Sequence, residues 1–265
     1  MMPAAAPTLI HRACLILLAL ATSFLCSCKT TKSVFASVSV KPSSFLSHGS
    51  ELKEDRSRSA FLGNWWTSDK KHQTAAEAIR KLYISPVRID AVRPMKNYLA
   101  RVEFSDERRQ KKLVELASYA QKRFIKAFKD SKTPRYEIVD APAEDAMTLD
   151  LHLLEWEPAA FSGFLARETI DLITFPAVGD LLWKPERAAT TIEGRLIEPK
   201  SQKSVFEFAD KEEAKTIIVL PVQEAFPTGQ ARFAIREWAR QFEVMMNNDS
   251  AKRPKDSSPI QIWAF

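Results

Sequence analysis

The feature that most constrains this chain is a long amphipathic stretch from Ser105 to about Asp130. At about 100° per residue, its apolar side chains gather on one side and its basic side chains on the other. The apolar side comprises Leu113, Leu116, Ala117, Ala120, Phe124, Ala127 and Phe128. Ser105 is a favourable N-cap, and Asp106 and Glu107 suit the positive end of a helix. The stretch therefore predicts a helix that must bury one side against a sheet or another helix.

Residues 147–156 predict a strand, because the apolar residues at 147, 149, 151 and 153 alternate with a more polar side that carries Asp150 and His152. By the same alternation, Glu155 and Glu157 are expected on the opposite side. Because strand spacing of two puts Asp150 and His152 on one face, a carboxylate there could orient an imidazole. The pair is the best catalytic candidate in the chain. A partly solvated sheet face explains it equally well, and no nearby Ser or Cys completes a triad.

Further elements are predicted on both sides of this strand. Residues 82–89 and 136–139 predict short strands, and residues 188–197 and 203–208 predict a hairpin. Residues 228–246 repeat the amphipathic helix pattern, with Thr228 as the cap. The order of these elements predicts a mixed α/β fold: a sheet of about five or six strands with two main amphipathic helices packed on it.

Three shorter segments are less regular. Thr74 and Glu77 have capping-box spacing, which predicts the start of a short helix. Residues 161–183 are apolar but interrupted by a proline and a glycine, so a helix followed by a loop is the interpretation there. Glu193 and Arg195 share one side of a strand, and we expect them to form a structural ion pair.

The first 27 residues have the pattern of a secretory signal peptide. They contain no acidic residue, and Arg12 precedes an apolar run from Ala13 to Leu25. The run is shorter than the about 20 apolar residues that a membrane-spanning helix needs. We expect residues 1–27 to be removed, which leaves residues 28–59 as the N-terminus and a flexible tether before the folded domain.

The end of this run, Leu25-Cys26-Ser27-Cys28, resembles the lipobox of bacterial lipoproteins. The resemblance implies cleavage behind Ser27 and attachment of diacylglycerol and palmitate to Cys28, with Cys26 as the alternative position. Lys29 stands where an Asp would retain a lipoprotein at the inner membrane. We therefore expect an outer-membrane lipoprotein that faces the periplasm.

Composition excludes several kinds of site. All three cysteines lie before residue 29, so the folded part contains no disulfide framework and no Cys-rich zinc site. The sequence has no HExxH, GxGxxG, GxxxxGK[ST] or GxSxG motif. We expect no metal, no cofactor and no catalytic centre. The net charge of +6 permits weak attraction to anionic surfaces, but without a reading motif it does not indicate nucleic-acid binding.

The basic side of the 105–130 helix is the candidate for such weak contact with an anionic surface. Its candidate residues are Arg108, Lys112, Lys122, Arg123 and Lys126. The fold forces them toward solvent opposite the apolar side, so a solvated charged face is the simpler interpretation.

Four short segments carry a resemblance to a known family. They are Thr191-Ile192-Glu193-Gly194-Arg195, Val205-Phe206-Glu207-Phe208-Ala209-Asp210-Lys211, Ile235-Arg236-Glu237-Trp238-Ala239 and Lys255-Asp256-Ser257-Ser258-Pro259. They resemble bacterial lipoproteins of the domain-of-unknown-function 3313 family, and the similarity extends over most of the chain from about residue 45. It implies an envelope lipoprotein with an α/β domain and supplies no catalytic residues. The family's usual Thr-Gly pair in the hairpin turn is Ser201-Gln202 here.

The sequence thus predicts a single domain over residues 60–247, followed by a tail at 248–265. Its predicted role is a lipid-anchored, non-enzymatic binding or structural module of the bacterial cell envelope. The membrane and another envelope protein are its expected partners. The alternative is a hydrolase or small-molecule binder that uses the face with Asp150 and His152; a deep pocket containing both side chains would favour it.

Overall fold

The computed structural model describes residues 40–55, 57–158, 188–213, 228–247 and 254–256. The predicted signal peptide, both candidate lipidation cysteines, residues 161–183 and most of the predicted tail lie outside this part. Within it, every helix is too short or too polar to cross a membrane.

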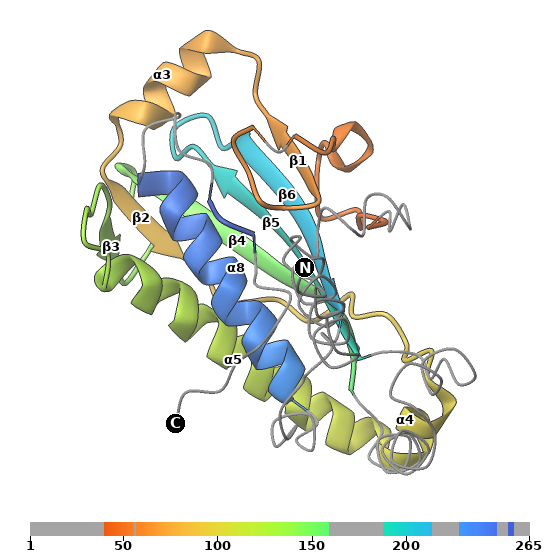
Figure 1. Cartoon of the computed structure of the whole chain (residues 1–265). Helices are drawn as coiled ribbons and strands as arrows, with labels where there is room; N and C mark the ends of the chain where they lie inside the picture. Colours follow the sequence, from red (N-terminus) through yellow and green to blue (C-terminus); the bar gives the residue numbers. More distant parts are fainter. Residues whose placement is uncertain (1–39, 56, 159–187, 214–227, 248–253, 257–265) are drawn as a thin grey trace, which may run out of the picture. The chain divides into compact units, whose positions relative to one another are not determined.

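A six-stranded mixed sheet forms the centre of the fold, in the order β1-β6-β5-β4-β2-β3 (Figure 1). Its strands are β1 (Gly63–Trp66), β2 (Lys81–Ile84), β3 (Glu137–Val139), β4 (Ala146–Glu157), β5 (Ala189–Ile197) and β6 (Ser204–Glu213). The first four in spatial order pair antiparallel, whereas β2 pairs parallel with both β3 and β4. The predicted mixed sheet is confirmed, and β1 is an edge strand that the sequence pattern does not predict.

Two long helices, α5 (Asp106–Lys129) and α8 (Gly229–Asn247), lie side by side over one face of this sheet (Figure 1). The main core fills the space between them and the sheet, with Phe124, Phe208 and Phe242 fully buried there. The described residues form three further helices, η1 (Gly49–Glu51), α3 (Lys70–Ala78) and α4 (Tyr98–Glu103). The two predicted amphipathic helices are therefore both present and packed as expected.

Local hydrogen bonding decides where two elements begin or end. The side chain of Asp69 accepts from the backbone N–H groups of Lys71 and His72, so α3 begins at Lys70, before the predicted cap at Thr74. A carboxylate suits this position because the helix N-terminus carries partial positive charge. Strand β2 ends at Ile84, five residues earlier than predicted, and beyond Pro86 its pairing with β4 resumes only as an isolated bridge between Arg88 and His152.

A β-bulge in β4 changes which side chains share a face. The register with β5 shifts between Leu153 and Glu155. One extra residue reverses the alternation after it. Glu155 and Glu157 therefore lie on the same side as Asp150 and His152, and the prediction that placed them opposite is wrong.

Part of the predicted flexible tether packs against the sheet. Residues 41–52, here called the N-terminal strap, pack on the sheet side that faces away from α5 and α8, and they contribute a small buried cluster around Phe45 and Leu46. The predicted flexible tether extends through residue 59, so it includes these packed residues. Their buried partners are charged side chains far away in the sequence, which a local pattern does not reveal.

Candidate functional site

The side of β4, β5 and β6 away from the helices is here called the polar face. It carries Asp150, His152, Glu155, Glu157, Glu193, Arg195 and Glu207, of which Glu193 and Glu207 have no exposed surface. A buried carboxylate is costly unless it is paired or hydrogen-bonded. The partners come from the N-terminal strap and from the segment between β2 and α4.

The strap binds both fully buried carboxylates. The backbone N–H of Ser43 donates to Glu193 Oε2 at 3.0 Å, and the Ser43 hydroxyl also donates to this carboxylate. The N–H groups of Ser47 and His48 donate to Glu207 at 3.2 and 2.8 Å. The Phe45 ring, from the middle of the strap, contacts the His152 ring edge-on at 5.2 Å between ring centroids. The strap therefore closes the polar face over the catalytic candidate His152.

Asp150 is held by its neighbours on the sheet. Its carboxylate accepts from Arg195 at 3.1 and 3.3 Å and from the Ser85 hydroxyl at 2.7 Å. Arg195 lies directly opposite Asp150 in the β4–β5 ladder, where side chains are closer than at i and i+2 on one strand. The predicted ion pair between Glu193 and Arg195 is therefore wrong.

His152 is enclosed, with only 2% of its side chain exposed. Its Nδ1 lies 3.3 Å from Glu193 Oε1, and its Nε2 accepts from the Ala91 N–H at 3.2 Å. A Ser–His–acid triad requires the imidazole between the hydroxyl and the carboxylate. Here the carboxylate of Glu193 lies between the Ser43 hydroxyl and His152. The arrangement is therefore not such a triad, and it links the strap to the imidazole through Glu193.

Glu155 and Glu157 organise the other end of the polar face. Glu155 accepts from Thr191 Oγ1 at 2.9 Å and from Arg93 and Lys96 at 3.2 Å each. Burial raises the pKa of Glu155, but these hydrogen bonds and cations outweigh it, so the net pKa is lowered. Glu157 accepts from the backbone N–H of Lys96 at 2.6 Å, just before α4. Neither role is predicted from the sequence, because the bulge that turns both side chains to this face leaves no mark in the local pattern.

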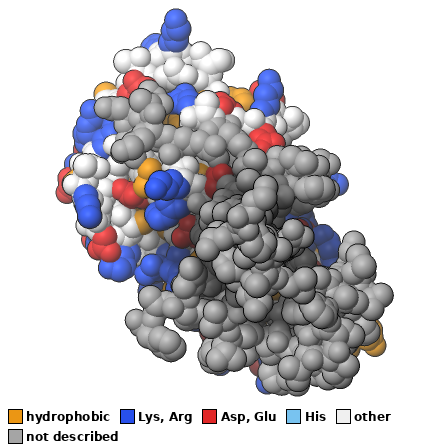
Figure 2. Space-filling view, viewed as in Figure 1, with side chains coloured by type: hydrophobic (Ala, Val, Ile, Leu, Met, Phe, Trp, Pro, Cys, Tyr) orange, Lys and Arg blue, Asp and Glu red, His pale blue; other side chains and the backbone are white. Residues whose placement is uncertain are grey.

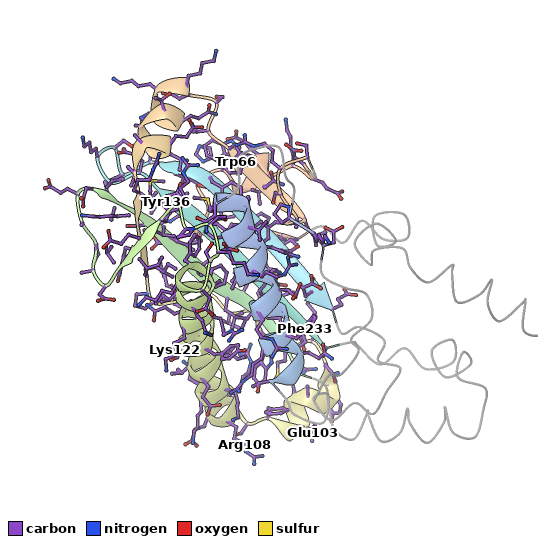
Figure 3. The ribbon with its side chains drawn as sticks, turned by 60° about the vertical axis from the view of Figure 1, so that its left-hand side comes forward. Trp66, Glu103, Arg108, Lys122, Tyr136 and Phe233 are labelled. Atoms are coloured by element: carbon purple, nitrogen blue, oxygen red, sulfur yellow. The ribbon has the colours of Figure 1, made fainter. Side chains whose placement is uncertain are left out.

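The candidate basic residues of α5 lie on the helix side away from the core. Arg108, Lys122 and Lys126 are exposed, whereas Lys112 and Arg123 are half-buried. Figure 3 shows Arg108 near the start of α5 and Lys122 further along it. Two of the charges are paired locally: Lys112 with Glu115 at 2.8 Å and Lys126 with Asp130 at 2.6 Å.

In Figure 2, basic side chains are interspersed with acidic ones over the coloured part of the molecular surface in view. Such mixed charge favours weak attraction over a specific site.

Among the described residues, no group of three or more His, Cys, Asp or Glu is arranged to hold a metal ion.

A cavity of about 870 Å³ opens at the end of the sheet where β2, β3 and β4 begin. It is here called the α3–α8 pocket, since both helices contribute to its wall. Its apolar lining includes Met147, Leu196, Val205, Met245 and Met246, and its rim carries Arg58, Arg80 and Arg135. Trp66 and Tyr136, labelled in Figure 3, also line it. The pocket contains neither Asp150 nor His152, so it does not provide the cleft that the hydrolase alternative needs.

Comparison with known proteins identifies the family. A family model described as "Protein of unknown function (DUF3313)" matches residues 41–242. The chain belongs to the DUF3313 family. The match begins at the first residue of the N-terminal strap and includes the polar face and most of α8. The suspected family is thereby confirmed, and no curated protein matches the sequence.

Two solved structures have a distant likeness to this DUF3313 protein. One is a PelC dodecamer variant from Paraburkholderia phytofirmans, which is 8% identical over 61% of this chain and 87% of that chain, with a TM-score of 0.34. The other is a putative neuraminyllactose-binding hemagglutinin homolog from Helicobacter pylori, which is 9% identical over 64% of this chain and 82% of that chain, with a TM-score of 0.26. Neither likeness carries an argument about this chain.

Proposed function

We propose that this DUF3313 protein is a lipid-anchored component of the bacterial cell envelope whose α/β domain binds another envelope component without catalysing a reaction. One observation carries the proposal. Of the two side chains with the best catalytic pattern, Asp150 is bound by Arg195 and Ser85, and His152 is enclosed beneath the N-terminal strap beside Glu193. A substrate would have to displace the strap to reach His152, so the open surfaces of the domain are suited to binding.

The position of the strap also supports an anchored protein. The strap begins at Lys41, whose carbonyl accepts from the Arg93 guanidinium beside Glu155. Lys41 lies 13 residues after Cys28, and an extended chain of that length reaches at most about 45 Å. A lipid on Cys28 would therefore hold the domain close to the membrane. The hydrogen bonds of the strap would transmit this restraint to the sheet.

Metabolic labelling with palmitate tests the anchor. We expect the wild-type chain to incorporate label and Cys28→Ala to lose both the label and the lipoprotein-type cleavage. Cys26→Ala is the matched control and should be labelled normally. Loss of label in Cys26→Ala with full labelling of Cys28→Ala would show that Cys26 is the modified residue. Absence of label from the wild-type chain would contradict the lipid anchor itself.

Chemical cross-linking in intact cells, followed by mass spectrometry, tests the binding role. We expect cross-links from exposed lysines of the domain, such as Lys122, to one recurring envelope component. A variant of the β5 carboxylate that holds the strap, Glu193→Gln, should leave these cross-links in place if the covered polar face is structural. Hydrolysis of an envelope substrate by the wild type that disappears in His152→Gln would instead support the hydrolase alternative.

A further inference from the structure

The α3–α8 pocket carries unbalanced positive charge at its rim. Three arginines and one glutamate, Glu77, line it, so its formal net charge is +2. Within the described part of the chain, the guanidinium groups of Arg58, Arg80 and Arg135 form no direct ion pair with a carboxylate, and the Arg58 charge makes a small contribution to the lowered pKa of Asp55. Guanidinium groups that are positioned but not neutralised favour an anionic ligand, which they bind through paired N–H donors.

The rim arginines are held in place while keeping donors unused. Arg80 donates through Nη1 to the Glu77 and Ile79 carbonyls, and Arg135 donates through Nη2 to the Glu77 carbonyl at 2.8 Å. These bonds secure both side chains to the C-terminal end of α3. A guanidinium has five N–H donors. Among the described residues, Nε and the second Nη of each arginine therefore have no acceptor.

The third arginine and the neighbouring aromatic residue add to this rim. The Arg58 guanidinium lies over the Trp66 ring, 4.2 Å from its centroid, and makes no hydrogen bond to another described residue. Trp66 Nε1 is buried without an acceptor in the described structure. A buried donor with no partner is rare and requires an explanation. A ligand oxygen in the pocket would supply the acceptor.

One part of the pocket lining is apolar and adaptable. Met147, Met245 and Met246 line it, and flexible thioether side chains adjust to the shape of an apolar group. Tyr136 completes the wall, and burial raises the pKa of its hydroxyl. The phenol therefore stays neutral at physiological pH and does not repel an anion.

We propose that the α3–α8 pocket binds an amphiphilic anion, with its carboxylate or phosphate at Arg58, Arg80 and Arg135 and its apolar chain over the methionine-lined interior. Its volume of about 870 Å³ lies within the range of small-molecule sites, about 300–1,000 Å³. The inference deepens the proposed binding function and rests on it, but it does not require the lipid on Cys28.

Isothermal titration calorimetry on the chain from residue 28 onward, with Cys28→Ser, tests this inference. This protein contains every described residue and lacks only the predicted signal peptide. The probes are octyl phosphate and octanoate, each below its micellar concentration, with octyl glucoside and inorganic phosphate as the uncharged and chain-free counterparts. We expect one octyl phosphate or octanoate per chain. The two counterparts should bind at least about 10-fold more weakly, and the tighter of the two anions identifies the head group.

Variants then locate the site. Arg58→Ala should weaken octyl phosphate binding by about 10- to 100-fold, because it removes a charged donor but no hydrogen bond within the described structure. Arg101→Ala on α4 is the matched control and should bind as wild type does, since Arg101 is also exposed and lies over an aromatic ring, that of Tyr98, but does not line the pocket. Arg135→Ala is a second pocket variant, with circular dichroism to check its fold; the Arg58→Ala result stands if it unfolds.

Each outcome bears on the inference. Equal binding of octyl glucoside would show an apolar site without anion recognition. Equal binding of inorganic phosphate would show a free-anion site, and unchanged binding in Arg58→Ala would place the ligand elsewhere; each of these results overturns the proposal. A chain that binds octyl phosphate but takes up no palmitate would keep this site and lose the lipid anchor, so the two failures are distinguishable.

Discussion

Gly194 is the position at which a single added methyl group should disturb this fold most directly. It lies in β5 with Leu151 of β4 opposite on one side and Phe208 of β6 on the other. A Cβ at Gly194 would overlap Phe208 Cε1 and would lie 2.6 Å from Phe208 Cζ and 2.8 Å from Leu151 Cδ2. Both neighbouring side chains are fully buried, so neither can rotate into solvent.

The Phe208 ring has little room to move. It stacks on Phe61 at 4.2 Å between centroids and packs at 5.7 Å against both Phe206 and Phe242. Overpacking of a well-packed core costs about 1–3 kcal/mol. Replacing glycine in a strand recovers about 0.5–1 kcal/mol. We expect Gly194→Ala to lower the free energy of unfolding by about 1–2 kcal/mol, which corresponds to a Tm about 2–8 °C lower for a domain of this size.

Thermal and guanidinium unfolding, followed by circular dichroism, measure this effect. Gly63→Ala is the matched control, since its nearest contact would be 3.3 Å to Leu52 Cβ at the edge of the sheet. A double-mutant cycle with Phe208→Leu should show coupling, because the smaller side chain makes room for the methyl group. Wild-type stability in Gly194→Ala, or the absence of coupling to Phe208, would refute the packing argument.

Four further predictions address other parts of the molecule. Trp238→Phe removes the indole donor 2.6 Å from the buried Asp210 carboxylate and should cost about 1.5–3 kcal/mol in urea unfolding; wild-type stability would contradict this role. Gln202 has a φ of 56°, so Gln202→Gly should raise the stability by about 0.5–1 kcal/mol, and a lower Tm would argue against strain at this turn. The lowered pKa of Glu155 stabilises the fold at neutral pH, and this contribution is lost as the pH falls below the ordinary value of 4.5. Glu155→Gln should therefore be less stable than wild type at pH 7, and the difference should shrink toward pH 3; a constant difference would refute the linkage. A charge-reversal variant of α5 combines Lys122→Glu, Arg123→Glu and Lys126→Glu. Weak binding of the unlipidated chain to anionic vesicles should disappear in molar salt and in this variant. Binding that survives either change would exclude an electrostatic α5 contact.

The elements with a long regular pattern are the ones that the sequence predicts well. Helices α5 and α8 each repeat apolar residues along one side, and Ser105 caps the first of them as expected. The hairpin β5–β6 also forms where alternation and turn residues predict it. These patterns are readable because burial recurs every 3.6 residues in a helix and every second residue in a strand.

The candidate site followed this local pattern only in part. Strand spacing correctly put Asp150 and His152 on one face, but it assigned Glu155 to the wrong side. A bulge depends on the pairing of β4 with β5, so it leaves no clear mark in the sequence of β4 alone. The partner of Arg195 was likewise misassigned because a residue 45 positions away lies closer to it than its neighbour on the same strand.

The sequence by itself determined the mixed α/β class, the two amphipathic helices and the family to which the chain belongs. Only the tertiary structure decided that residues 41–52 close over Glu193 and Glu207, more than a hundred residues away along the chain. It also assembled the α3–α8 pocket from arginines that precede β1, β2 and β3 in turn. Periodicity records how each segment meets the core, whereas hydrogen bonds and cavities depend on which distant segments the folded chain brings into contact.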